Sequence, residues 1–161
     1  MVSADTNQQL GVIHLADIRT RIESQLEVQS YLQDLRYALD HGATVTFQAE
    51  RQVDQARPVQ YTNKFTVADL FPDENPVSAL KRELRTLTVE EYIQTVQDLH
   101  FPNRSEMREF GKVYAGKGDV YIKIRVELLS AYGGHTAFIM SFHYAEIPFT
   151  SEMFPYRKKG G

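Results

Sequence analysis

The chain has 161 residues, of which 42% are hydrophobic and 24% charged, a mix typical of one globular domain with a real core and not of a disordered protein. It contains no cysteine, which excludes disulfide scaffolds, zinc–thiolate sites and a cysteine nucleophile, and which fits a reducing compartment. The formal net charge is −3, so the whole chain lacks the basic excess that marks many nucleic-acid-binding proteins.

The first forty residues predict a loose start and then a helix. Residues 1–14 are polar and have no basic stretch followed by an apolar block, so we expect neither a leader nor a membrane span. We therefore expect a cytoplasmic protein. From Asp17 to Asp40, apolar residues recur mostly at intervals of three and four. This spacing predicts one long helix or two short ones, ending before Gly42.

The middle of the chain predicts a strand followed by shorter helices. Residues Ala43–Ala49 alternate between apolar and polar side chains, which is strand periodicity. The polar segment 50–64 contains Pro58 and is expected to be a loop, with a short helical turn at Thr66–Phe71.

Two helix starts follow. Proline after Asn75 favours the first turn of a helix, because its missing N–H would have no partner there. Thr88 and Glu91 have the spacing of a capping box, which predicts a further helix that ends near Phe101.

The last third predicts strands joined by glycine-containing turns, arranged as a three-stranded antiparallel meander. The three expected strands are Met107–Tyr114, Asp119–Leu129 and Thr136–Tyr144. With helices early and strands late, the fold class is α+β, with N-terminal helices packed on one face of an antiparallel sheet. We expect a single domain over residues 15–145 and a C-terminal extension over 146–161.

The central strand of this meander has a polar face made of Tyr121, Lys123, Arg125 and Glu127. Antiparallel sheets often leave one face to solvent, and this is the plain explanation of the pattern. The functional interpretation is that a phenol, an ammonium group and a guanidinium group on one flat surface suit a phosphodiester.

Strand pairing brings a histidine to the same face. The last strand places His143 opposite Lys123 in one register and opposite Tyr121 in another, with Phe138, Met140 and Phe142 turned to the core. Cross-strand side chains lie about 5 Å apart, close enough to serve one phosphate. Histidine has an ordinary pKa of about 6.5 and can act there as the acid or base of RNA cleavage.

The first strand of the meander is expected to extend this cationic surface. If Tyr114 pairs with Asp119, Lys112 lies opposite Tyr121 and Arg108 opposite Arg125. A register shifted by one residue turns both inward and Glu109 outward. Three further candidates are Arg104, just before this strand, which could reach the same surface, and Glu109 and Glu127 as general bases.

Other kinds of site have weaker support. The sequence has no phosphate-binding glycine loop and no histidine pair at helical spacing, so we expect no cofactor and no metal.

Short motifs along residues 15–145 resemble the MqsR family of toxins from toxin–antitoxin systems. The matching segments are Leu39-Asp40-His41-Gly42, Thr44-Val45-Thr46-Phe47, Phe71-Pro72-Asp73, Leu87-Thr88-Val89-Glu90-Glu91-Tyr92, Val113-Tyr114, Gly118-Asp119-Val120-Tyr121-Ile122-Lys123-Ile124 and Met140-Ser141-Phe142-His143. The order and spacing of these motifs agree with the family pattern, and the C-terminal third matches best.

The resemblance implies a RelE-like fold that cleaves mRNA without metal by attack of the ribose 2′-hydroxyl, leaving a 2′,3′-cyclic phosphate. It assigns catalytic roles to Tyr121, Lys123 and His143, with Tyr144 completing a His-Tyr pair that is similar to the end of related RelE-like toxins. It also implies a cognate antitoxin partner, and it leaves the oligomeric state open.

The chain differs from the MqsR-family pattern at two positions. Ile93 stands where the family has a lysine, and a family glutamine falls at about the position of Gly111. The alternative function is therefore a catalytically degenerate RelE-like module that binds RNA or a protein partner. A third interpretation, a small-molecule enzyme, predicts a deep pocket instead of an open cationic face.

Charge is distributed unevenly along the chain. Residues 1–99 carry 9 basic and 15 acidic side chains, whereas residues 100–161 carry 9 basic and 6 acidic ones, a local net charge of +3. Phosphate binding responds to the potential within a Debye length of about 8–10 Å, so the basic strand region remains a candidate RNA surface.

Overall fold

The computed structural model describes residues 17–51, 55–128 and 133–158, which form the α+β fold predicted from the sequence. A six-stranded sheet has the order β1-β3-β4-β5-β6-β2, with every neighbouring pair antiparallel except β2 and β6. The strands are β1 Ile18–Arg21, β2 Thr44–Phe47, β3 Tyr92–Asp98, β4 Met107–Tyr114, β5 Gly118–Glu127 and β6 Thr136–Tyr144. The helices are α2 Gln25–Asp40, α3 Asn63–Leu70 and α4 Pro76–Arg85.

The expected helix over 17–40 is correct only from Gln25. Ser24 and Glu27 form a capping box that fixes the start of α2, and Gly42 follows its end with a φ of 74°. The preceding residues form β1, which pairs with β3. Ile18 and Ile22 fit helical spacing, but Ile22 is exposed, so no apolar helix face exists there to bury.

The strand predicted at Ala43–Ala49 is confirmed as β2, and the helix predicted to start after Asn75 is confirmed as α4. In the segment expected to be a loop, α3 begins at Asn63, because the Thr62 side chain accepts a hydrogen bond from the Phe65 N–H and caps it.

The helix expected after Thr88 is wrong. The capping box between Thr88 and Glu91 forms, yet it produces a single 3-10 turn (η3, Val89–Glu91), and the chain then enters β3. Residues of β3 pair with β1 on one side and with β4 on the other, so sheet hydrogen bonds outweigh the local helix signal.

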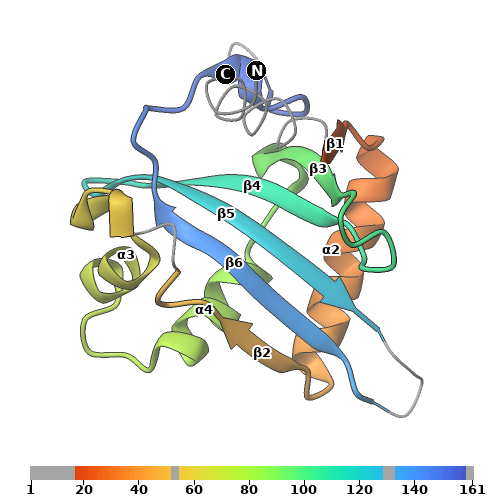
Figure 1. Cartoon of the computed structure of the whole chain (residues 1–161), viewed down its shortest axis with the longest axis horizontal. Coiled ribbons are helices and arrows are strands. Elements are labelled where there is room, and N and C mark those ends of the chain that lie inside the picture. Colours follow the sequence, from red (N-terminus) through yellow and green to blue (C-terminus); the bar gives the residue numbers. More distant parts are fainter. Residues whose placement is uncertain (1–16, 52–54, 129–132, 159–161) are drawn as a thin grey trace, which may run out of the picture.

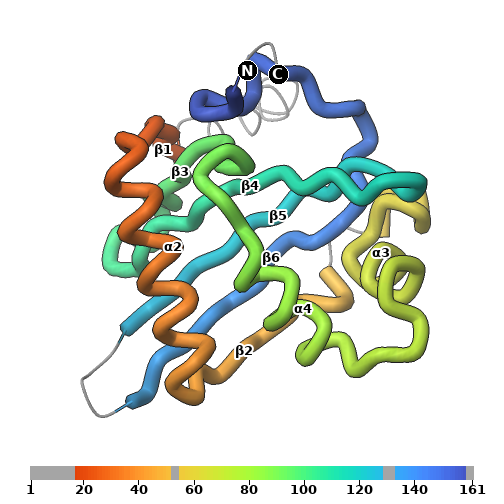
Figure 2. Tube along the Cα trace, turned by 180° about the vertical axis from the view of Figure 1, so that it is seen from behind, coloured from red at the N-terminus to blue at the C-terminus, as the bar shows by residue number. Residues whose placement is uncertain are grey.

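The meander of β4, β5 and β6 is confirmed. Helices α2 and α4 cover one face of the sheet (Figure 2), where the core contains Leu35, Leu80, Leu84, Phe110, Ile122 and Phe142. Figure 1 looks onto the opposite face, where the strands lie in front of these helices. We call this second surface the open face.

Beyond the end of β2, side chains of helix α3 form hydrogen bonds with the backbone along the edge of β6. The Asn63 amide donates to the carbonyl oxygens of Gln48 (2.8 Å) and Met140 (2.9 Å) and accepts from the Phe142 N–H (3.0 Å). The Thr66 hydroxyl accepts from the Tyr144 N–H at 2.9 Å. These side chains satisfy backbone groups that an edge strand otherwise exposes, and they fix the end of β6.

The segment after β6 folds back over the domain. Phe149 and Phe154 rest on Gly111 of β4 so closely that an added Cβ there would come within 2.7 Å of both rings. The Tyr156 ring stacks on Tyr92 with centroids 6.2 Å apart. The predicted loose N-terminus, residues 1–14, lies outside the described residues.

We predict that Asn63→Ala lowers the free energy of unfolding by about 2–4 kcal/mol, because it leaves one N–H and two carbonyl groups of buried backbone without their partner. Chemical denaturation measures this. The matched variant Asn75→Ala, which removes a single helix cap to Ser78, should cost only about 1 kcal/mol. Equal losses in the two variants would contradict the proposed role of Asn63.

Candidate active site on the open face

The β5–β6 pairing places Tyr121 directly opposite His143, which is one of the two registers expected from the sequence. The two rings have centroids 5.4 Å apart. Lys123 lies opposite Ser141, so four polar side chains, two from each strand, lie together on the open face.

A bulge between Lys123 and Ile124 changes the register further along. Arg125 therefore pairs with Phe138, and its guanidinium lies over that ring at 5.3 Å. The expectation that Phe138 faces the core is wrong, because the extra residue in β6 turns it to the open face.

The pairing of Tyr114 with Asp119 is wrong, and β4 and β5 adopt the alternative register, shifted by one residue. Gly111 lies opposite Tyr121, and Glu109 lies opposite Lys123. The alternating pleat therefore turns Arg108 and Lys112 to the helix side, away from the predicted phosphate surface, and brings Glu109 to the open face.

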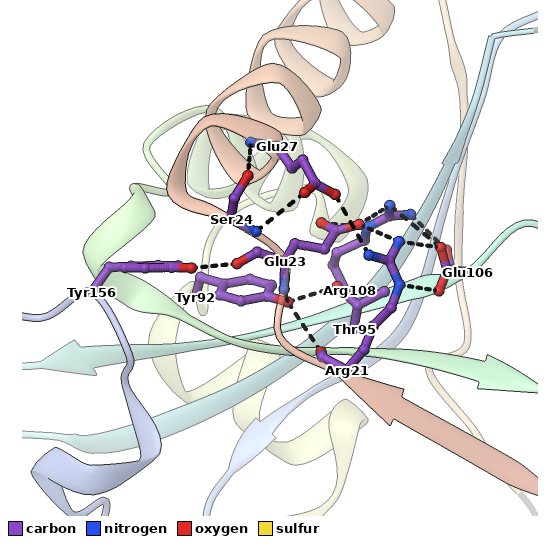
Figure 3. A network of polar contacts seen from close by, with 9 residues as sticks. All are labelled: Arg21, Glu23, Ser24, Glu27, Tyr92, Thr95, Glu106, Arg108 and Tyr156. Atoms are coloured by element: carbon purple, nitrogen blue, oxygen red, sulfur yellow. Dashed lines mark hydrogen bonds and ion pairs between the residues drawn. The ribbon is translucent and has the colours of Figure 1, made fainter.

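Arg108 and Lys112 have partners on the helix side. Figure 3 shows Arg108 beside Glu23, within a network that also includes Arg21 and Glu106. An Arg108 guanidinium nitrogen lies 2.6 Å from a Glu23 carboxylate oxygen. The Lys112 ammonium donates to the Thr86 hydroxyl at 2.7 Å.

Two further candidates lie away from Tyr121. Tyr144 belongs to the helix-side face, and its hydroxyl donates to Asp69 at 2.6 Å. Burial, reinforced by this carboxylate, raises the pKa of Tyr144. Arg104 lies in the turn before β4 over the Phe101 ring, at the opposite end of β5 from Tyr121. The structure thus brings together Tyr121, Lys123, His143 and Arg125 and leaves four predicted phosphate ligands elsewhere.

Glu109 is the acidic group of the open-face site. It is only 7% exposed, and its carboxylate accepts from the Gln94 amide at 3.0 Å and from the Tyr121 hydroxyl. The Lys123 ammonium lies 3.9 Å away. Glu127, the other base suggested by the sequence, accepts from Ser105 at the far end of β5, about 20 Å along the strand from Tyr121.

Burial sets the protonation of the two neighbours of Glu109. It raises the pKa of the Tyr121 phenol, and the adjacent carboxylate raises it further, so Tyr121 is a hydrogen-bond donor and not a base. Burial also lowers the pKa of Lys123, an effect that the negative charge of Glu109 partly offsets.

Arg51 is a site residue that sequence reasoning missed. It follows β2, in a segment expected to be a connecting loop, and its guanidinium donates to the Ser141 hydroxyl at 3.0 Å. Its charge acts on both Tyr121 and Lys123. No periodicity or motif marks Arg51, because only the parallel pairing of β2 with β6 brings it to this face.

Among residues 17–51, 55–128 and 133–158, no three His, Cys, Asp or Glu side chains lie together as a metal site would require. The described helices also include none that is long and apolar enough to cross a membrane.

In comparisons with known proteins, no family model, no curated protein and no solved structure matches this chain. The resemblance to MqsR-family toxins therefore remains a prediction from the sequence motifs.

We predict that Glu109→Gln lowers the pKa of Lys123 further, because it removes the charge that opposes the effect of burial. The titration of the Lys123 side-chain carbon Cε, assigned with a Lys123→Arg variant, measures this by NMR. Glu127→Gln serves as the control and should leave the pKa of Lys123 at its wild-type value. An unchanged or raised Lys123 pKa in Glu109→Gln would contradict the proposed contact.

Proposed function

We propose that this protein is an endoribonuclease that cleaves RNA on the open face without a metal ion. The main support is that a buried carboxylate, Glu109, lies opposite Lys123, and a histidine, His143, lies opposite the next residue of that face, Tyr121. RNA cleavage needs a base, an acid and positive charge around one phosphate, and these four side chains supply all three.

In the proposed reaction, Glu109 accepts the proton of the ribose 2′-hydroxyl as its oxygen attacks the adjacent phosphorus. The bond from phosphorus to the 5′-oxygen breaks, and His143 in its protonated form donates a proton to that oxygen. The products are a 2′,3′-cyclic phosphate and a 5′-hydroxyl.

Cationic groups stabilise the charge that develops on the phosphate oxygens. Lys123 lies next to Glu109, and Arg51 approaches from the Ser141 side, so the two flank the space above β5 and β6. Arg125 extends the positive charge along β5. Tyr121 stays protonated and orients Glu109 through its hydroxyl.

The resemblance extends the proposal to a biological role. Under it, the protein is the toxin of a type II toxin–antitoxin system, its substrate is mRNA, and a cognate antitoxin covers or distorts the site. A cytoplasmic location follows from that role, since mRNA and the antitoxin are found there.

A second function, a RelE-like module that binds RNA or a protein without cleaving it, is favoured by one observation. Gly111, which takes the place of a family glutamine, is covered by Phe149 and Phe154. A substrate cannot contact that position while the two rings rest on it.

We predict that the purified protein cleaves single-stranded RNA in EDTA and leaves 2′,3′-cyclic phosphate ends. His143→Ala and Glu109→Gln should each lower kcat by about 10²–10⁴, the usual contribution of a general acid or base. The controls are His100→Gln and Glu127→Gln, which change the same residue types away from the site. The mechanism is refuted if the RNA stays intact, if it is cleaved only with added divalent ions, or if the products carry 5′-phosphates.

Growth of cells that express the isolated gene separates the two functions. We expect the wild-type chain to arrest growth and a Tyr121→Phe/His143→Ala double variant to be tolerated at equal protein level. If neither protein affects growth, the binding module is the better account.

A further inference from the structure

A cavity of about 430 Å³ lies beside the candidate active site, between the sheet and the segment that follows β6. Tyr121 and His143 line it from the sheet, and Ile147, Pro148 and Met153 line it from the segment. Its volume falls within the range of about 300–1,000 Å³ that is usual for sites of small organic groups.

The segment that follows β6 is held in place at several points, so the protein's own contacts maintain the cavity. The N–H of Ala145 donates to the Asp119 carbonyl and that of Phe149 to the Asp119 carboxylate, each at 2.8 Å. Further along, Phe154 is buried against Gly111, and the Tyr156 hydroxyl donates to the Glu23 carbonyl (Figure 3).

The lining indicates which chemical group fits. The walls are mostly apolar, and the sheet contributes two aromatic rings, those of Tyr121 and His143. Arg57 and Glu146, 3.8 Å apart, supply a charged pair with donors and an acceptor. A flat aromatic heterocycle with polar edges satisfies such a lining, since it stacks on rings and forms hydrogen bonds at its edge.

We propose that this cavity binds one nucleobase of the RNA, next to the phosphate that is cleaved. This inference rests on the proposed function, because the shared residues Tyr121 and His143 place the base beside the reacting phosphate. The C-terminal segment thereby selects the substrate as single-stranded RNA, in which an unstacked base is free to enter.

The test is a comparison of 2′-deoxy octanucleotides, which lack the attacking hydroxyl, with an abasic octamer of the same charge. Fluorescence anisotropy measures the Kd of the full chain for the four homopolymers dA, dC, dG and dT and for the abasic chain. At least one homopolymer should bind about tenfold more tightly than the abasic octamer, because stacking of one base contributes about that factor.

Variants of the cavity locate the effect. Ile147→Ala and Met153→Ala should each reduce the preference for bases over the abasic chain severalfold while leaving abasic binding unchanged. Ile147 is 79% exposed, so its truncation should not affect folding. Leu26→Ala is the matched control, since Leu26 is 71% exposed on α2, away from the cavity, and it should change neither affinity.

The inference is overturned if wild type binds abasic and base-containing octamers equally, or if the cavity variants keep the full preference. RNA cleavage in EDTA is measured separately on the same preparations. A base preference without cleavage would support base binding in the cavity and refute the proposed nuclease activity. Cleavage without a base preference would support the nuclease activity and refute base binding in the cavity.

Discussion

The pairing of Tyr121 with His143 across β5 and β6 is the constraint on which the candidate site depends. Helix α3 holds that end of β6 through Asn63 and Thr66, which bond the backbone on either side of His143. The bulge between Lys123 and Ile124 then turns Phe138 to the open face opposite Arg125. A shift of this register would separate the ring pair and reverse the faces of the cationic residues.

The neighbouring pair of strands determines where the carboxylate lies. Because Glu109 is opposite Lys123, a negative charge is buried among a lysine, a phenol and an amide, which is costly unless each group is satisfied. The same register turns Arg108 to the helix side, where it forms an ion pair with Glu23 within the network that holds β1 and α2 together. One register thus places a structural arginine on the helix side of β4 and a buried carboxylate of the candidate site on its open face.

Much of this arrangement can be predicted from the sequence. Alternation in residues 119–127 indicates the open face, and the start of α4 follows from proline after Asn75. What periodicity cannot supply is register and pairing over long distances. A genuine helix-capping box, formed by Thr88 and Glu91, lies directly before β3, and the hydrogen bonds of β3 to β1 and β4 override that signal. Arg51 likewise reaches the site only because β2 adds to the far edge of β6.

If the open face is the catalytic surface, one RNA phosphate binds there between β4, β5 and β6. Chemical-shift mapping of the labelled protein with a 2′-deoxy oligonucleotide tests it most directly. We expect saturable shift changes concentrated at Tyr121, Lys123, Ser141 and His143. Changes confined to the face formed by α2 and α4 would contradict it.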